Sequence, residues 1–288
     1  MKNCLRTSIA PNANGRTAAH HWLTTPALQL SAAVHAGSAL LAILNPGIWQ
    51  WALGAVLFNH LILTAGVIRP KSRLLGPNMT HLPAEAARRR EVSLTFDDGP
   101  DPEVTPRVLD LLDRYGAKAS FFCIANKVTA YPELAREIIK RGHSLENHTN
   151  SHPYAFALFG PGGILREIES AQAAICAVTG VTPRFFRAPM GFRPPFLAPA
   201  VERNGLCCAT WTRRGFDTFA RHPEPVLQQL LRDLAAGDIL LLHDGRPNRP
   251  NKNAQVILEV LPHLLEHLQT LNLKSVSLTA ACNHGAGL

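Results

Sequence analysis

The hydrophobic pattern divides the chain into two unlike parts, and the first is a long stretch without charge. Residues 27–68 contain no Lys, Arg, Asp or Glu, and two apolar runs cover residues 28–44 and 48–68. A helix that spans a bilayer needs about 20 mainly apolar residues, with about 17 as the lower limit. The sequence Asn-Pro-Gly at residues 45–47 is a turn signal. The pattern therefore predicts a two-helix membrane anchor, a transmembrane helical hairpin over residues 27–68.

The charges that flank this hairpin predict its orientation. Lys and Arg lie before the first run and after the second. The positive-inside rule then places residues 1–26 and the C-terminal part in the cytoplasm of a bacterial-type inner membrane with two spans. A cleaved signal peptide fits poorly, because a long polar segment precedes the first run and a second run follows. If only the second run spans and the first lies at the interface, the C-terminal part is periplasmic.

The second part of the chain, residues 91–288, alternates short strand-like runs with amphipathic helical patterns. This alternation is typical of βαβ units with parallel strands. The strand-like runs are residues 92–96, 119–124, 143–147, 184–187, 205–211, 238–243 and 275–278. The helical patterns are residues 106–115, 132–141, 163–178, 225–236 and 254–271. We predict an α/β fold, a distorted (β/α) barrel of about seven parallel strands, whose active site lies at the carboxyl ends of the strands.

The net charge supports the membrane interpretation. The chain has a formal charge of +8 and a pI near 9.5, which taken alone suggests a nucleic-acid partner. Residues 1–91, however, hold nine Lys and Arg against two Glu, a net of +7, and the remaining residues carry +1. The excess surrounds the hairpin, with residues 69–90 as a basic linker. We therefore expect membrane lipids as partners and no nucleic acid.

Two polar motifs at predicted strand ends suggest a metal site. The first run ends in Asp97 and Asp98, followed by Gly-Pro, and the third leads into His148 and His152. The two histidines are four residues apart, so one helical turn would place both imidazoles on one face. Asp98 can supply a third ligand, and a site of two His and one carboxylate leaves positions open for water and substrate. Zinc is the expected divalent metal, with cobalt, nickel or manganese as alternatives.

Two further strand ends carry residues suited to acid–base work. Arg187 precedes a Pro-Met-Gly turn and can fix a carboxylate through a charge-assisted pair. His243 follows the apolar run Ile-Leu-Leu-Leu and is a candidate general acid. Each of these residues, taken alone, is more often structural, and Asp-Asp-Gly-Pro is also a common turn.

Taken together, the motifs resemble the polysaccharide deacetylase family, carbohydrate esterase family 4, with its NodB homology domain. The resemblance runs from about residue 92 to residue 278, through TFDDGP, NHTNSH, FRAPMG, an Asp motif and LLLHDG in that order. It implies that Asp97 is the general base and that Asp98, His148 and His152 hold the metal. It further implies that Arg187 orients Asp97, that His243 is the general acid tuned by Asp217, that the Met190 N–H stabilises the oxyanion, and that Leu241 lines the acyl pocket.

The Asp motif departs from the family pattern. Thr218 follows Asp217 where the family usually has Trp, and Arg214 stands where an upstream acidic residue is common. Met190 likewise takes a place often held by Tyr. Pocket shape and charge preference are therefore open, and Arg213 and Arg214 are either solvated charges or contacts for an anionic substrate group.

The leading functional hypothesis is removal of N-acetyl groups from N-acetylglucosamine-type amino sugars in a poly- or oligosaccharide or lipid-linked glycan. A cytoplasmic active site disfavours external chitin or cell-wall glycan and favours a lipid-linked amino-sugar intermediate. One alternative is a non-catalytic glycan-binding or glycan-assembly membrane protein on the same fold. Another is a deformylase or other amidase, because the motifs specify the chemistry better than the acyl group.

Overall fold

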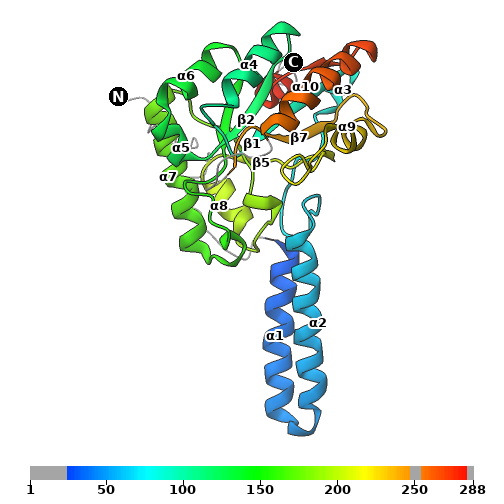
Figure 1. Cartoon of the computed structure of the whole chain (residues 1–288). Helices are drawn as coiled ribbons and strands as arrows, with labels where there is room; N and C mark the ends of the chain where they lie inside the picture. Colours follow the sequence, from blue (N-terminus) through cyan, green and yellow to red (C-terminus); the bar gives the residue numbers. More distant parts are fainter. Residues whose placement is uncertain (1–24, 247–253, 284–288) are drawn as a thin grey trace.

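The computed structural model describes residues 25–246 and 254–283, and its most extended feature is a helical hairpin (Figure 1). Helices α1 (Pro26–Leu44) and α2 (Trp49–Ile68) are joined by the short 3₁₀ helix η1 (Pro46–Ile48) and run antiparallel away from the main body. Both are long and apolar enough to cross a bilayer, with mean hydropathy of 1.7 and 1.8. Nearly all of this apolar surface is exposed in the structure, and both helices could be membrane spans.

Polar side chains join the two helices of the hairpin. Asn59 Nδ2 donates to Ser31 Oγ at 2.8 Å, and the rings of His35 and His60 meet with their Nε2 atoms 3.4 Å apart. Polar pairs of this kind hold helices together where lipid offers no partner.

The main body is a curled half-barrel of parallel strands, as predicted. Along the sheet the order is β5-β4-β3-β2-β1-β7-β6, and β8 pairs with the start of β1. Every strand pair is parallel. The strands are β1 (Glu91–Asp97), β2 (Ala119–Cys123), β3 (Ser144–Asn147), β4 (Phe185–Phe186), β5 (Cys207–Cys208), β6 (Arg213–Arg214), β7 (Ile239–His243) and β8 (Lys274–Ser275).

One segment pairs with strands from both edges of the sheet and differs from the prediction. The apolar run at residues 205–211 was expected to form a single strand, but the chain forms β5, a short gap and then β6. The Cys207 N–H bonds to Arg184 next to β4, whereas the Thr212 N–H bonds to Ile239 of β7. The segment changes partners part-way along, which closes the curled sheet and was not visible in its hydrophobicity.

Helices pack around the sheet and complete the core (Figure 1). The five predicted helices form within two or three residues at most of their ends, except that α9 stops earlier. The four short helices α3, α5, α8 and α11 were not predicted. The bounds are α3 (Ala84–Arg88), α4 (Thr105–Arg114), α5 (Ala125–Ala130), α6 (Pro132–Lys140), η2 (Phe156–Leu158), α7 (Pro161–Thr179), η3 (Pro189–Gly191), α8 (Leu197–Arg203), α9 (Pro223–Leu231), α10 (Ala254–Thr270) and α11 (Leu278–Asn283).

The core explains why β1 is central. Phe96 and Phe121 stack with their ring centroids 5.1 Å apart, and both side chains are fully buried. Leucines of β7, α4 and α10 join the same cluster. Because this packing fixes β1 between β2 and β7, it also fixes the carboxylates at the end of β1.

Residues 69–90, expected as a basic linker, pack along the main body. Leu75 and Leu82 are buried, and Met79 forms a parallel bridge with Ala209. Arg193 donates to the carbonyl oxygens of Ser72, Gly76 and Pro77. The segment is basic in composition, but it connects the hairpin to the barrel through fixed contacts.

Candidate active site

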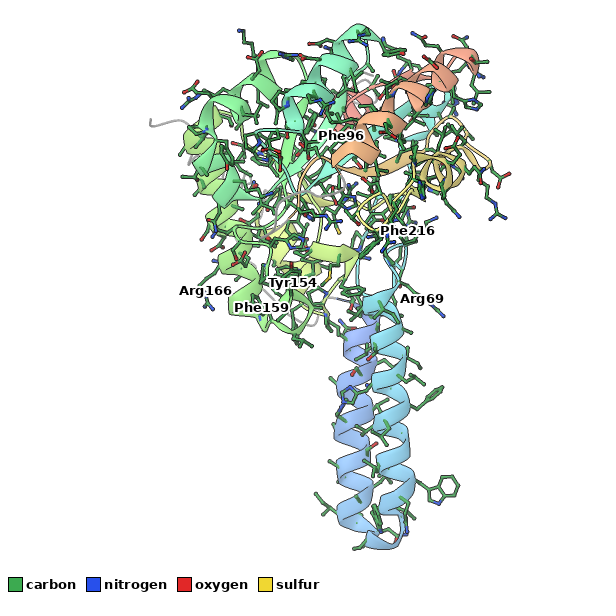
Figure 2. All side chains as sticks on the ribbon, viewed as in Figure 1. Arg69, Phe96, Tyr154, Phe159, Arg166 and Phe216 are labelled. Atoms are coloured by element: carbon green, nitrogen blue, oxygen red, sulfur yellow. The ribbon has the colours of Figure 1, made fainter. Side chains whose placement is uncertain are left out.

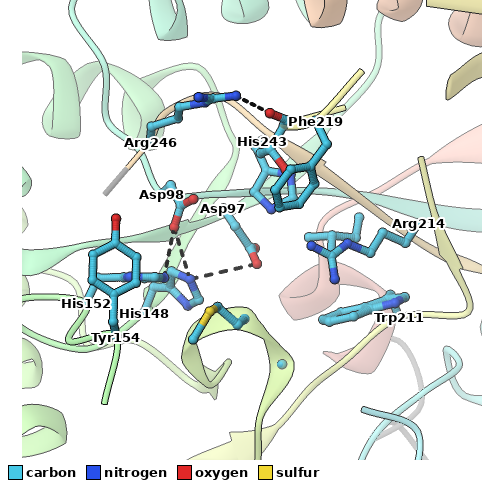
Figure 3. A pocket seen from close by; sticks show the side chains of 14 residues that line it. Asp97, Asp98, His148, His152, Tyr154, Trp211, Arg214, Phe219, His243 and Arg246 are labelled. Carbon is cyan, nitrogen blue, oxygen red and sulfur yellow. Dashed lines mark hydrogen bonds and ion pairs between the residues drawn. The ribbon is translucent and has the colours of Figure 1, made fainter. Parts of the chain in front are cut away.

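A pocket of about 230 Å³ opens at the carboxyl ends of the strands, where the sequence predicted the site (Figure 3). Seven of the nine predicted site residues line it or lie at its mouth, and Arg187 and Asp217 stand directly behind. The lining residues are Asp97, Asp98, His148, His152, Tyr154, Met190, Gly191, Trp211, Arg214, Thr218, Phe219, Leu241, His243 and Arg246.

Asp98, His148 and His152 form a compact buried cluster. Asp98 Oδ1 lies 3.3 Å from the Nε2 atom of each histidine, and the three ligand atoms lie within 4.8 Å of one another. The Nδ1 of His148 bonds to the Arg187 carbonyl oxygen at 2.8 Å, which directs its Nε2 toward Asp98. The Asp98 side chain is buried, and its Oδ1 faces both imidazoles. A divalent cation fits this donor set, because two imidazoles and a carboxylate are the ligands that zinc prefers.

One helical turn was expected to place His148 and His152 on the same face, but the backbone around this cluster is not helical. Residues 148–152 form a loop in which Thr149 and His152 have φ values of 69° and 51°. Asp98 has φ 71°. The His152 N–H donates to Thr149 Oγ1 at 3.0 Å, and the Thr149 N–H donates to Asn147 Oδ1 at 2.9 Å. Residues other than glycine rarely adopt positive φ, and such strain concentrates at functional sites.

The protonation states of Asp98 and His152 suit metal binding. Burial opposes the charge of Asp98, but the hydrogen bond and charge of His148 outweigh it and lower the pKa of Asp98 to about 2. Burial, assisted by the charge of His148, lowers the pKa of His152 to about 4. At neutral pH, Asp98 is therefore ionised and His152 is neutral, which are the forms that coordinate metal. Burial opposes a charged His148 imidazole, but the charge of Asp97 and the hydrogen bond of Asp98 outweigh it and raise the pKa of His148, so a bound metal would have to displace that proton.

Asp97 lies beside the cluster and is held by a buried arginine. Arg187 Nη1 donates to Asp97 Oδ1 at 2.7 Å and to Thr95 Oγ1 at 2.8 Å. The guanidinium carbon of Arg187 lies 4.0 Å from the centroid of the Phe122 ring, and the side chain is fully buried. Further bonds to the carbonyl oxygens of Ala209 and Thr210 use its remaining N–H groups. Arg187 thus fixes Asp97 in one orientation, with Asp97 Oδ2 3.9 Å from His148 Nε2.

His243 and Asp217 form a second couple across the pocket. Asp217 accepts bonds from the ring Nδ1 and from the backbone N–H of His243, both at 2.8 Å. Burial opposes a charged imidazole, but the charge and hydrogen bond of Asp217 outweigh it and raise the pKa of His243 to about 9. A histidine with this pKa is protonated at neutral pH and can donate a proton.

The remaining predicted residues separate into pocket and scaffold. Leu241 is buried in the pocket wall, and Met190 stands at the mouth with φ 56°. Arg214 lines the pocket above Trp211, 5.5 Å from the ring centroid. Arg213 points the other way and pairs with Asp238 Oδ2 at 2.6 Å. The two adjacent arginines, treated alike in the sequence, therefore differ because successive strand residues face opposite sides.

Sequence reasoning missed several pocket residues. Tyr154, Phe219 and Arg246 line the pocket, and Thr95 positions Arg187. Arg246 is three residues past His243, so its proximity to that motif was the available signal. Phe219 lies in a loop with no pattern of its own, and only the fold brings it to the mouth.

Comparison with known proteins places the chain in a family. A sequence model described as polysaccharide deacetylase matches residues 84–208. A chitooligosaccharide deacetylase of Bradyrhizobium sp. (strain ANU 289) is 36% identical over 159 residues, which are 55% of this chain and 72% of the relative. A peptidoglycan-N-acetylglucosamine deacetylase of Bacillus cereus is 32% identical over 181 residues, which are 60% of this chain and 81% of the relative.

A solved structure agrees with these relatives. The crystal structure of the Bc1960 peptidoglycan N-acetylglucosamine deacetylase superimposes with a TM-score of 0.65 at 26% identity, covering 71% of this chain and 92% of that one. The agreement extends over the half-barrel that carries the pocket. The chain belongs to the polysaccharide deacetylase family, carbohydrate esterase family 4.

Proposed function

We propose that the protein is a metal-dependent hydrolase that removes N-acetyl groups from N-acetylglucosamine-type amino sugars of a glycan. The observation that carries the proposal is the arrangement of one pocket: the Asp98, His148 and His152 cluster, Asp97 beside it, and protonated His243 opposite. The relatives, named for deacetylation of chitooligosaccharide and peptidoglycan, support the reaction type and the amino-sugar substrate.

The mechanism divides the proton transfers between Asp97 and His243. A divalent ion, with zinc expected, would polarise the amide carbonyl and activate the attacking water when bound by Asp98, His148 and His152. Asp97, held by Arg187, takes the proton of that water as general base. His243, held by Asp217, gives its proton to the nitrogen of the leaving amine.

Two pocket residues complete the proposed site. The backbone N–H of Met190, held at the mouth by a left-handed turn, would donate to the developing oxyanion. Leu241 would contact the methyl of the acyl group from the pocket wall. This pocket accepts a small acyl group, so a deformylase or related amidase activity is the outcome that a substrate panel must separate from deacetylation.

The hairpin is proposed as the membrane anchor, with residues 91–288 as the catalytic domain. The packing of α1 against α2, with the Asn59–Ser31 bond between them, supports two spans over one. The basic residues at both ends support the cytoplasmic orientation by the positive-inside rule. A catalytic domain on that side would meet lipid-linked amino sugars before export.

The test is deacetylation by the full-length protein of chitooligosaccharides and of a polyprenyl-phosphate-linked N-acetyl amino sugar, with released acetate measured. Asp97→Asn should lower kcat by roughly 10²–10⁴-fold while the metal content is unchanged. His148→Ala should lose both activity and metal. Asp238→Asn, a buried carboxylate outside the pocket, is the matched control for Asp97→Asn. A non-catalytic glycan-binding protein would release no acetate and would bind sugar equally well in all three variants.

A further inference from the structure

The end of the hairpin is built into the wall of the catalytic pocket. The Arg193 N–H donates to the carbonyl oxygen of Val67 in the last turn of α2 at 3.1 Å. Gly191, a pocket residue, packs so closely that an added Cβ would lie 3.2 Å from Pro70 Cγ. Lys71 Nζ donates at 2.6 Å to the carbonyl oxygen of Thr212, between Trp211 and β6. Contacts on two sides of the pocket thus fix the distance between the pocket and the end of the hairpin.

The lengths of the helices place this pocket wall at the bilayer surface. Helices of 19 and 20 residues rise roughly 28–30 Å, and the hydrocarbon core is about 30 Å thick. Pro70 follows the last residue of α2 by two positions, so it lies within about 7 Å of the hydrocarbon boundary. The head-group layer is of that same thickness, about 5–8 Å on each side. Gly191, which touches Pro70, therefore lies at the depth of the lipid head groups.

Apolar side chains are exposed at the mouth of the pocket and on the surface beside it, on this same end of the domain. We define the apolar rim as Tyr154, Leu158, Met190, Phe216 and Phe219, with exposed fractions of 57%, 87%, 39%, 51% and 77%. Figure 2 shows Tyr154, Phe159 and Phe216 on the end of the domain from which the hairpin leaves. Exposed aromatic residues of this density are costly in water and are typical of surfaces that meet a membrane interface.

Exposed cations accompany the apolar rim. Arg69, Lys71 and Arg73 follow α2 directly and are exposed. Arg166, also exposed, lies at the same end of the domain on α7 (Figure 2). Cations close to an anionic bilayer surface add to binding, and aromatic side chains between them enter the interface.

We propose that the apolar rim and its cations rest on the lipid head groups, so that the catalytic pocket opens at the membrane surface and takes an amino sugar linked to a lipid phosphate. This inference rests on the proposed deacetylation and names its substrate class. Arg214 supplies the cation inside the pocket, since its Nε is buried without a hydrogen-bond partner among the described residues. Its guanidinium lies between Trp211 and Phe216, 4.9 Å from the Phe216 ring. A phosphate on the lipid-linked sugar would pair with this guanidinium.

Docking itself is tested without any activity measurement. Leu158→Trp places a fluorophore on the rim of the full-length protein in phosphatidylcholine vesicles with and without phosphatidylglycerol. The emission gained over that of the unmodified protein, whose four tryptophans supply the background, should be quenched by brominated lipids, and more strongly in the anionic vesicles. Val181→Trp is the matched control: it is also exposed, but it follows the far end of α7, a helix about 28 Å long. Equal quenching at both positions overturns the docking. A signal that depends on protein concentration also overturns it, because it would mean that a second copy of the protein covers the rim.

The substrate class is tested by a pair of charge variants. Leu158→Glu with Arg166→Glu should lower kcat/KM for a vesicle-embedded polyprenyl-phosphate-linked N-acetyl amino sugar about tenfold, because both changes oppose docking on an anionic surface. Turnover of soluble chitooligosaccharide should stay within about twofold, since neither residue lines the pocket. Val181→Glu with Arg114→Glu should change neither rate. Equal loss on both substrates contradicts the inference, whereas no turnover of either by the unmodified protein contradicts the proposed deacetylation.

Discussion

Two groups of polar side chains, one at the carboxyl end of the barrel strands and one in the middle of the hairpin, differ in how they are satisfied. In the hairpin, Asn59 and Ser31 satisfy each other, and the helical backbone around them is regular. In the barrel, His152 Nδ1 is buried without a hydrogen-bond partner among the described residues, and His152 has a positive φ. A satisfied pair stabilises association, whereas an unsatisfied polar atom on a strained backbone is stable only because the rest of the fold holds it. The difference is what the proposed role of the barrel cluster leads us to expect.

The largest effect is expected at Arg187, which joins the strained cluster to the core. Arg187→Leu leaves the Asp97 carboxylate buried and unpaired, so the free energy of unfolding should fall by about 3–5 kcal/mol. Deacetylation should also be lost, since Asp97 is no longer oriented. Chemical denaturation of the full-length protein in detergent measures the first effect and acetate release the second.

A surface arginine provides the comparison for Arg187. Arg136 pairs with Glu133 on α6, where both side chains are well exposed. Arg136→Leu should change the free energy of unfolding by about 1 kcal/mol or less. If the two substitutions cost the same, Arg187 is not the buried support of Asp97 that the structure describes.

The second effect concerns the pH range of activity and follows from the Asp217–His243 couple. As the proposed acid, His243 must be protonated, and activity falls as pH rises through its pKa of about 9. Asp217→Asn removes the charge that raises this pKa, so the alkaline limit should move toward the ordinary value of about 6.5. At pH 8 the variant should lose roughly tenfold or more in kcat, with less loss at pH 6.

The control for the pH shift is again a carboxylate outside the pocket. Asp238 is buried and pairs with Arg213 rather than with a pocket histidine. Asp238→Asn should leave the alkaline limit where it is. An unshifted pH–rate profile for Asp217→Asn would remove His243 from the role of general acid.

The third effect tests the contact between the end of the hairpin and the pocket wall, at Gly191. Gly191 has φ 76°, and an added Cβ would lie 2.4 Å from the Trp211 ring and 3.2 Å from Pro70. Gly191→Ala should therefore destabilise the domain by about 1–3 kcal/mol beyond backbone strain alone, and should disturb the pocket wall. Thermal unfolding and KM for the glycan measure the two consequences.

Gly180 separates backbone strain from crowding. It caps α7 with φ 74°, and nothing lies within 4 Å of an added Cβ. Gly180→Ala carries the backbone cost alone, about 1–2 kcal/mol, and should leave KM unchanged. Similar behaviour of the two alanine variants would mean that the hairpin end does not shape the pocket.

The strand ends could be predicted from the sequence because parallel strands carry their chemistry at one edge. Asp97, Asp98, Arg187 and His243 each follow an apolar run, and the fold brings them together as that rule requires. The spacing of His148 and His152 suggested a metal pair, and the order of the motifs, through its resemblance to a family, added Asp217. These inferences needed only local patterns and one general rule of topology.

The parts that could not be predicted depend on long-range packing. The apolar run at residues 205–211 holds only β5, and β6 follows it at two arginines. The change of partner from β4 to β7 depends on strands that are far away in sequence. The positive φ of His152 occurs in a loop where its N–H bonds to Thr149 Oγ1, and it cannot be read from residue type. Phe219 reaches the pocket mouth from a loop without periodicity.

The smallest effect is expected in the hairpin, at the satisfied pair. Asn59→Leu removes the bond to Ser31 and leaves its hydroxyl free to bond within its own helix, so the cost should be only about 0.6 kcal/mol. Unfolding of the hairpin in mixed detergent micelles measures it, with Thr64→Val at an exposed position of α2 as the control. Activity on soluble chitooligosaccharide should not change, because no pocket residue contacts Asn59. If Asn59→Leu instead abolished activity, the polar groups of the hairpin would have to act on the pocket through α2. The Asn59–Ser31 pair could then no longer be treated as purely structural.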